Sequence, residues 1–99
     1  MLTGKQKRFL RSEAHHLSAL FQVGKGGVNE HLIKHIEVAI ETRELIKICI
    51  LQNCEDDKQE IADQLAKETK SYLVQLIGLT VVLYKPSKNN KKIVLPTKG

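Results

Sequence analysis

The stretch "FQVGKGGVNEHLIKHI", residues 21–36, joins a short apolar run to a helical pattern through three of the chain's six glycines. Residues 20–23, Leu-Phe-Gln-Val, are typical of a strand. Asn29 is a good N-cap for a helix over residues 30–42, in which apolar side chains recur at the spacing of one buried face. A strand that passes through a tight turn into an amphipathic helix predicts an α/β fold.

The segments on either side follow the same logic. Thr3 and Gln6 have the spacing of a capping box for a first helix over residues 4–16. In residues 44–51 isoleucines alternate with other side chains, which indicates a strand with one face in the core. Further patterns predict a helix over 57–69 and strands over 72–77 and 80–85. Gly78 and Leu79 form a two-residue hairpin signal, with the glycine supplying the positive φ of a type II′ turn.

The expected order is therefore α-β-α-β-α-β-β. Strand–helix–strand units require right-handed parallel crossovers, whereas the final hairpin is antiparallel. We expect a single compact α/β domain over residues 1–96, with a mixed four-stranded sheet packed with helices. Residues 85–99 form a basic C-terminal tail, partly extended, in which Ile93, Val94 and Leu95 are expected to dock on the domain.

Charge is unevenly distributed along the 99 residues. Residues 1–12 carry four basic and no acidic side chains, and residues 85–99 carry five lysines and no acid, so the two ends hold +9. The remainder has 7 basic and 11 acidic side chains, which brings the chain to its net +5. Basic ends on a mildly acidic body favour a polyanionic partner if the ends meet in space. Basic tails that only keep a small protein soluble are the alternative.

Several classes of protein fit the sequence poorly. No apolar run approaches the roughly 18 residues of a membrane span, and charged residues interrupt the N-terminus where a signal peptide would be apolar. Cys49 and Cys54 are too few for a disulfide framework and lack the second pair of a zinc site. These features indicate a cytoplasmic protein with no membrane partner, no metal and no cofactor.

The glycine stretch has three interpretations. Gly24-Lys25-Gly26-Gly27 is a G-x-x-G pattern next to a helix N-terminus, where free N–H groups and the helix dipole favour an anion. A Walker loop is excluded because no Lys-Ser or Lys-Thr follows the glycines, and a dinucleotide fingerprint fails because Asn29 stands at its third glycine. A plain strand-to-helix turn stays open, although one glycine would serve it.

The other candidate groups give little chemistry. His31 and His35 share a helix face at zinc-like spacing, but Leu32 stands where a zinc protease motif has glutamate. No nucleophile and base have a defensible spacing, so we expect no enzyme. With only four aromatic residues, the chain is expected to bind nucleic acid by backbone and shape rather than by stacking bases.

Four segments taken in order resemble the CRM domain (chloroplast RNA splicing and ribosome maturation), in its bacterial single-domain, YhbY-like form. They are "LTGKQKRFLRSEAHHL", "FQVGKGGVNEHLIKHI", "ELIKICI" and "VQLIGLTVVLYKPS", and the resemblance extends from about Leu2 to Pro96. It implies an RNA-binding fold similar to the C-terminal domain of translation initiation factor 3. It also implies association with precursors of the large ribosomal subunit, and RNA contacts centred on the G-x-x-G loop.

The resemblance and the charges together predict an RNA-binding protein that assists large-subunit assembly, as a monomer bound to ribosomal RNA. The RNA-binding residues are expected to be the G-x-x-G loop with four basic residues: Gly24, Lys25, Gly26, Gly27, Lys5, Arg8, Lys34 and Lys47. Gly24 and Gly27 would form the framework of the loop and Gly26 would allow close approach, while the tail lysines act as a looser electrostatic arm. Leu79 departs from the family, which often has a basic residue at the hairpin turn.

Two other functions remain open at this stage. The first is a protein-interaction module whose basic ends bind an acidic protein. The second is a metal-dependent enzyme that uses His31 and His35.

Overall fold

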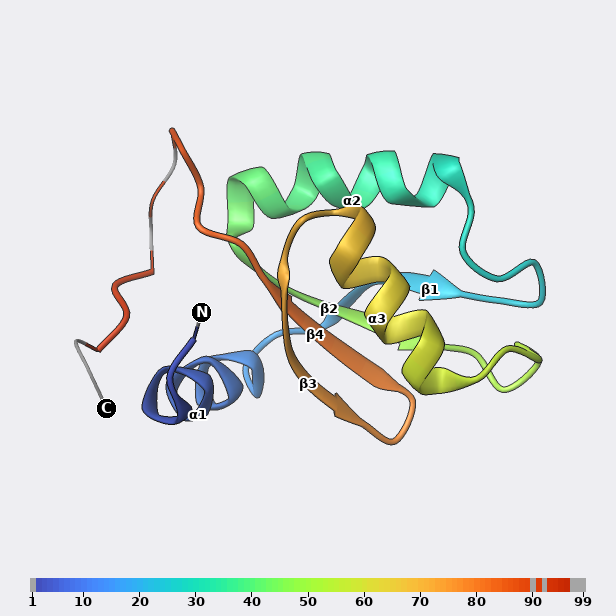
Figure 1. Ribbon diagram of the computed structural model, residues 1–99, viewed down its shortest axis with the longest axis horizontal. Helices are drawn as coiled ribbons and strands as arrows, with labels where there is room; N and C mark the ends of the chain where they lie inside the picture. The colour runs from blue at the N-terminus through green and yellow to red at the C-terminus, as the bar shows by residue number, and fades with distance from the viewer. Residues whose placement is uncertain (1, 90, 92, 97–99) are drawn as a thin grey trace.

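The computed structural model describes residues 2–89, 91 and 93–96. The order of elements is the expected one (Figure 1). The helices are α1 (Gly4–Ala14), α2 (Glu30–Arg43) and α3 (Lys58–Glu68), and the strands are β1 (Ala19–Val23), β2 (Leu45–Ile50), β3 (Tyr72–Ile77) and β4 (Thr80–Tyr84). Among the described residues no helix combines the length and the apolar character needed to cross a membrane.

The four strands form one mixed sheet in the order β1-β2-β4-β3. β1 pairs with β2 in parallel, while β4 is antiparallel to both of its neighbours. The hairpin between β3 and β4 turns at Gly78 and Leu79, and φ is positive only at Gly78 (57°), as a type II′ turn requires. The predicted α/β architecture, with parallel crossovers and a final antiparallel hairpin, is confirmed.

The sheet separates two hydrophobic clusters. α2 and α3 cover one face, and α1 lies against the other (Figure 1). Ile46, Ile48 and Ile50 of β2 point to the α2–α3 side, and each is at most 1% exposed. Leu10 and Ala14 of α1 pack instead with Leu45, Val74, Val82 and Tyr84 on the other face. The alternation of isoleucines in the sequence therefore predicts correctly which side chains of β2 lie in the core.

The caps set the helix boundaries. Thr3 and Gln6 form the full capping box of α1, with each side chain accepting from the other residue's backbone N–H at 3.1 and 3.0 Å. α1 ends at Ala14, two residues earlier than expected, because His15 is already its C-cap. β2 begins at Leu45 rather than Glu44, since Glu44 is the C-cap of α2 with a φ of 65°.

The C-terminal tail docks on the α1 side of the sheet, as expected for Ile93 and Leu95, which pack against its cluster. Val94 between them is exposed, and the segment adds no strand. The Gln6 side-chain amide donates to the Pro96 carbonyl at 3.1 Å. Lys92 and Lys98, two of the lysines expected to form an electrostatic arm, lie outside the described residues.

Two carboxylates at the end of α2 hold the start of the tail. Glu44, which has no exposed surface, accepts from the backbone N–H of Ser87 and of Ile93, both at 2.8 Å. Glu41 accepts from the Ser87 hydroxyl at 2.9 Å, and this bond holds the pKa of the Glu41 carboxyl below its ordinary value. A buried glutamate with positive φ thus connects the tail to the domain.

We expect Glu44→Ala to lower the free energy of unfolding by about 2 kcal/mol, because two buried N–H groups lose an acceptor. Glu44→Gly loses the same acceptors but tolerates positive φ, so it should be about 1 kcal/mol more stable than Glu44→Ala. Urea denaturation of both variants and the wild type measures the two effects separately. Equal stability of the alanine and glycine variants would show that the backbone at residue 44 is not strained.

Candidate nucleic-acid interface

Three loops meet at the end of the sheet where β1, β2 and β3 reach their C-terminal residues. They are residues 24–29, residues 51–57 and the hairpin at 78–79. The Leu51 N–H donates to the Val23 carbonyl at 2.8 Å, and the Ile50 N–H donates to the Leu79 carbonyl at 2.7 Å. These bonds fix the three loops relative to one another. Leu79 packs against the core cluster beside α2 and α3, which explains an apolar residue at the turn.

The glycine loop is a β-turn. The Gly27 N–H donates to the Gly24 carbonyl at 2.9 Å, so Lys25 and Gly26 are the two central residues of the turn. Both central residues are exposed, and Gly27 follows them with a φ of 69°. The turn therefore presents the Lys25 side chain and the bare Gly26 backbone to solvent together.

The fold requires only one of these glycines. A Cβ on Gly27 would lie 2.6 Å from a carboxylate oxygen of Asp56, at a φ that side chains rarely adopt. A Cβ on Gly24 would make ordinary contacts, the nearest at 3.6 Å to Leu51, and one on Gly26 would meet nothing within 4 Å. Gly27 is therefore the glycine that the turn conformation requires, whereas Gly24 closes the turn through its carbonyl and has no steric need to be glycine.

The start of α2 contributes less to an anion site than the sequence suggests. The Asn29 side chain caps the helix by accepting from the Leu32 N–H at 2.8 Å, and Glu30 places a negative charge in the first turn. Asp56 also lies against Gly27. Since both acids oppose an anion, a phosphate fits best on the Lys25–Gly26 side of the turn, away from Asp56.

Beyond the turn, one face of the sheet is open. Gln22, Cys49, Thr80 and Ile77 are neighbours across the four strands. They point away from α2 and α3, because their sequence neighbours pack on that side. Each is exposed or half-buried, so α1 leaves this row uncovered. The row gives a flat surface of short, mostly polar side chains next to the glycine turn.

A basic hollow lies where the open row meets α1. Arg11, Ala14 and His15 of α1 face Lys47, Gln75 and Thr80 of the sheet around a cavity of about 140 Å³. The Lys47 ammonium donates to the Leu17 carbonyl at 3.2 Å, so this lysine also ties the chain after α1 to β2. Sequence reasoning missed Arg11 and His15. Their spacing of four residues placed them on one helix face, but nothing in the sequence showed that this face meets Lys47.

The structure groups some of the expected basic residues and separates others. Lys5 and Arg8 are exposed on α1, on the same side of the sheet as Lys47. Lys34 is exposed on α2, which covers the opposite face. The sheet therefore lies between Lys34 and Lys47, and the two lysines do not share one surface.

Metal and stacking chemistry have little support at this end of the sheet. The rings of His31 and His35 lie 4.3 Å apart on α2, yet the described residues contain no group of three potential metal ligands. Phe21 packs toward α2 and α3, and Phe9 of α1 packs against the cluster on the other face of the sheet. The open row itself contains no aromatic residue. The arrangement is suited to phosphate and sugar contacts rather than to base stacking.

Comparison with known proteins gives consistent matches over nearly the whole chain. The profile of the CRS1/YhbY (CRM) domain matches residues 2–85. A Bacillus subtilis protein named "Probable RNA-binding protein YqeI" is 66% identical over 96 residues, which cover 97% of this chain and all of the relative. A Haemophilus influenzae protein named "RNA-binding protein" is 41% identical and is covered over 97% of its length.

The fold has a solved counterpart as well. The solution structure of the hypothetical protein SAV1595 from Staphylococcus aureus superposes with a TM-score of 0.82 at 57% sequence identity. The match covers 97% of this chain and 100% of the other. The three helices and the mixed sheet described above therefore recur in a protein with a closely similar sequence.

The glycine turn makes a direct prediction about stability. Gly27→Ala should lower the free energy of unfolding by about 1–2 kcal/mol, because alanine is strained at positive φ. Gly26→Ala, with open space around the new methyl group, should change it by less than about 0.5 kcal/mol. Thermal or urea denaturation of the two variants compares neighbouring sites with the same chemical change. Equal losses at both positions would contradict the geometry of the turn.

Proposed function

This chain belongs to the CRS1/YhbY (CRM) domain family, and we propose on that basis that it binds RNA, specifically ribosomal RNA in a precursor of the large ribosomal subunit. We propose also that it assists assembly without catalysing a reaction, as a cytoplasmic monomer. The names of its relatives support the RNA-binding part. The structural observation that carries the proposal is the glycine turn, in which half-buried Gly24 and exposed Gly26 have no steric need to be glycine.

In this proposal a backbone phosphate lies against the exposed turn. The bare backbone of Gly24 and Gly26 lets the phosphate approach closely, and Lys25 supplies the charge. The carboxylate of Asp56, which lies against Gly27, repels the phosphate and keeps it on the Lys25–Gly26 side of the turn. The glycine turn thus fixes the position of one nucleotide without selecting its base.

The rest of the strand would follow the open sheet face toward α1. Lys47 lies four residues before Leu51 at the loop edge, or roughly 13 Å along β2 at the rise of a strand. Arg11, His15 and Lys47 then meet the backbone at the far end, while Lys5 and Arg8 extend the basic surface along α1. Lys34 belongs to the opposite face and has no contact in this arrangement.

Lys25→Ala should weaken RNA binding about tenfold and make the salt dependence shallower by about one unit of log–log slope. The wild-type slope is expected near −3 to −5, because about 4–6 phosphates are neutralised. Fluorescence anisotropy of a labelled large-subunit rRNA fragment, titrated at several salt concentrations, measures both quantities.

The matched control is Lys67→Ala, which removes the same charge from the exposed last turn of α3. It should leave affinity within about twofold, and neither variant should shift the thermal midpoint by more than about 2 °C. Equal losses of affinity for the two variants would mean that general charge, not the turn, carries binding. Unfolding of the Lys25 variant would make the turn structural.

Assembly on the ribosome is tested in cell extracts. The protein should sediment on a sucrose gradient with large-subunit particles, and RNase treatment should release it, because the proposed contact is to RNA. Binding that persists after RNase and depends on one acidic protein would favour a protein-interaction module instead.

A further inference from the structure

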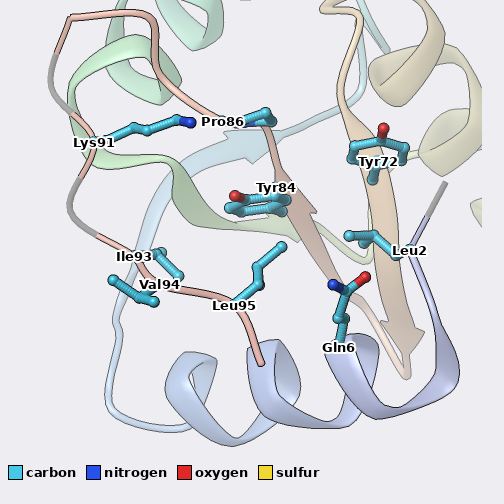
Figure 2. A pocket seen from close by; sticks show the side chains of 9 residues that line it. All are labelled: Leu2, Gln6, Tyr72, Tyr84, Pro86, Lys91, Ile93, Val94 and Leu95. Carbon is cyan, nitrogen blue, oxygen red and sulfur yellow. The ribbon is translucent and has the colours of Figure 1, made fainter. Parts of the chain in front are cut away.

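A second concave site lies at the other end of the strands from the glycine turn (Figure 2). It is a cavity of about 500 Å³ between α1, the start of β3, the end of β4 and the docked tail. Its walls include Gln6, Tyr72, Tyr84, Lys91, Ile93 and Leu95. Small-molecule sites commonly have volumes of about 300–1,000 Å³, with mainly apolar walls and a few polar groups. The size and the lining both suit one planar group.

Two aromatic rings form the inner wall. Tyr72 and Tyr84 face each other across β3 and β4, and their rings are nearly parallel at 16° with centroids 6.4 Å apart. Tyr84 is 3% exposed, whereas Tyr72 is 40% exposed. A partly exposed aromatic ring beside a buried one is a surface on which a further ring can stack. Burying the exposed part of the Tyr72 ring would stabilise the fold, so packing of the core does not explain why the ring is exposed.

Polar groups surround the rings. Figure 2 shows the Lys91 side chain reaching above Tyr84, with Gln6 on the far side of the cavity. Within the described part of the chain, Gln6 uses one N–H on Pro96 and one lone pair on Thr3, which leaves its amide one donor and one acceptor site. Burial, followed by the charge of Glu44, raises the pKa of the Tyr84 hydroxyl.

One cation lines the cavity. Lys91 forms part of its wall, and the neighbouring acids Glu41 and Glu44 accept hydrogen bonds from the tail. A stacking ring, hydrogen-bonding groups at its edge and a cation together match a nucleobase with its phosphate. A purely apolar ligand would leave Lys91 and Gln6 without a role.

α1 connects this cavity to the RNA surface already described. Gln6, near the start of α1, lines the tyrosine cavity, and Arg11 and His15, at its end, line the basic hollow beside Lys47. The exposed side of α1 between them carries Lys5 and Arg8, and residues 1–12 contain no acid. A bound RNA strand can therefore run from the glycine turn across the uncharged row to the basic hollow, and from there along α1 to the tyrosines.

We propose that the Tyr72–Tyr84 cavity binds the base of an unpaired nucleotide in the RNA that the glycine turn holds by its backbone. This inference rests on the proposed RNA-binding function and adds a preference for RNA with a single-stranded nucleotide. β3 has six residues, so the two sites are about 20 Å apart along the strands, and they are further separated across the sheet because β1 and β3 are its two edge strands. The unpaired nucleotide therefore lies several steps away from the phosphate at the glycine turn.

The test compares two labelled RNA hairpins from the same rRNA, one with a four-adenosine 3′ overhang and one without. Anisotropy measures their affinity for the wild type and for Tyr72→Leu and Tyr72→Phe. The wild type should bind the overhang RNA about tenfold more tightly, since stacking one base contributes that much. Tyr72→Leu should lose this difference, Tyr72→Phe should keep it, and neither should change binding of the hairpin without overhang.

A second readout needs no label, because Tyr72 and Tyr84 are the only tyrosines of the chain and it has no tryptophan. Adenosine monophosphate should quench tyrosine fluorescence saturably, whereas ribose 5-phosphate, the same anion without a base, should not. The far-side variant Lys67→Ala serves as the folded control in both assays.

The outcomes separate the two proposals. Equal binding of both hairpins by wild type and Tyr72→Leu would overturn the cavity assignment and leave RNA binding intact. Failure of both hairpins to bind the wild type would overturn both. Quenching by adenosine monophosphate with no effect of the overhang would assign the cavity to a free nucleotide and overturn its link to RNA.

Discussion

The unequal cover of the two sheet faces is the constraint on which the rest of the structure depends. α2 and α3 bury the isoleucines of β2 along the whole strand, so one face is fully used for folding. α1 has 11 residues, about 16 Å of helix, and covers only one end of the other face. The uncovered end borders the three loops, and the covered end borders the tail. For this reason the tyrosine cavity and the basic hollow lie at the two ends of α1.

Electrostatics then divide the surface. Acids gather beside the glycine turn in residues 55–57, and Glu30 begins α2, so an anion is restricted to the Lys25–Gly26 side. At the other end Glu41 and Glu44 are acids too, but their oxygens accept from Ser87, Lys88 and Ile93 and hold the tail. Hydrogen bonding thus uses the acids at this end of the sheet to hold the tail, and the tail contributes Lys91 to the tyrosine cavity.

The sequence predicted what depends on local patterns. Caps, the alternation of isoleucines in β2 and the Gly78 turn gave the order of elements and the mixed sheet, with boundaries displaced by one or two residues. It did not predict what depends on packing between distant segments. The approach of Arg11 to Lys47 requires knowing where α1 docks, and the Tyr72–Tyr84 pair requires the register of β3, which shifts between Leu73 and Gln75. Glu44 at positive φ breaks a local preference, and long-range bonds of its side chain to the tail and of its carbonyl to Lys85 help to hold it there.

Residues that the fold does not need are the strongest guide to function in this domain. Gly27 is explained by its φ and by Asp56, and Leu79 by its contact with the core, so neither requires a ligand. Gly24 and Gly26 have space for a side chain. Tyr72 exposes ring area whose burial would have stabilised the fold. The first two lie at one end of the proposed RNA surface and the third at the other, with α1 between them. One strand of RNA that binds along α1 would contact all three residues.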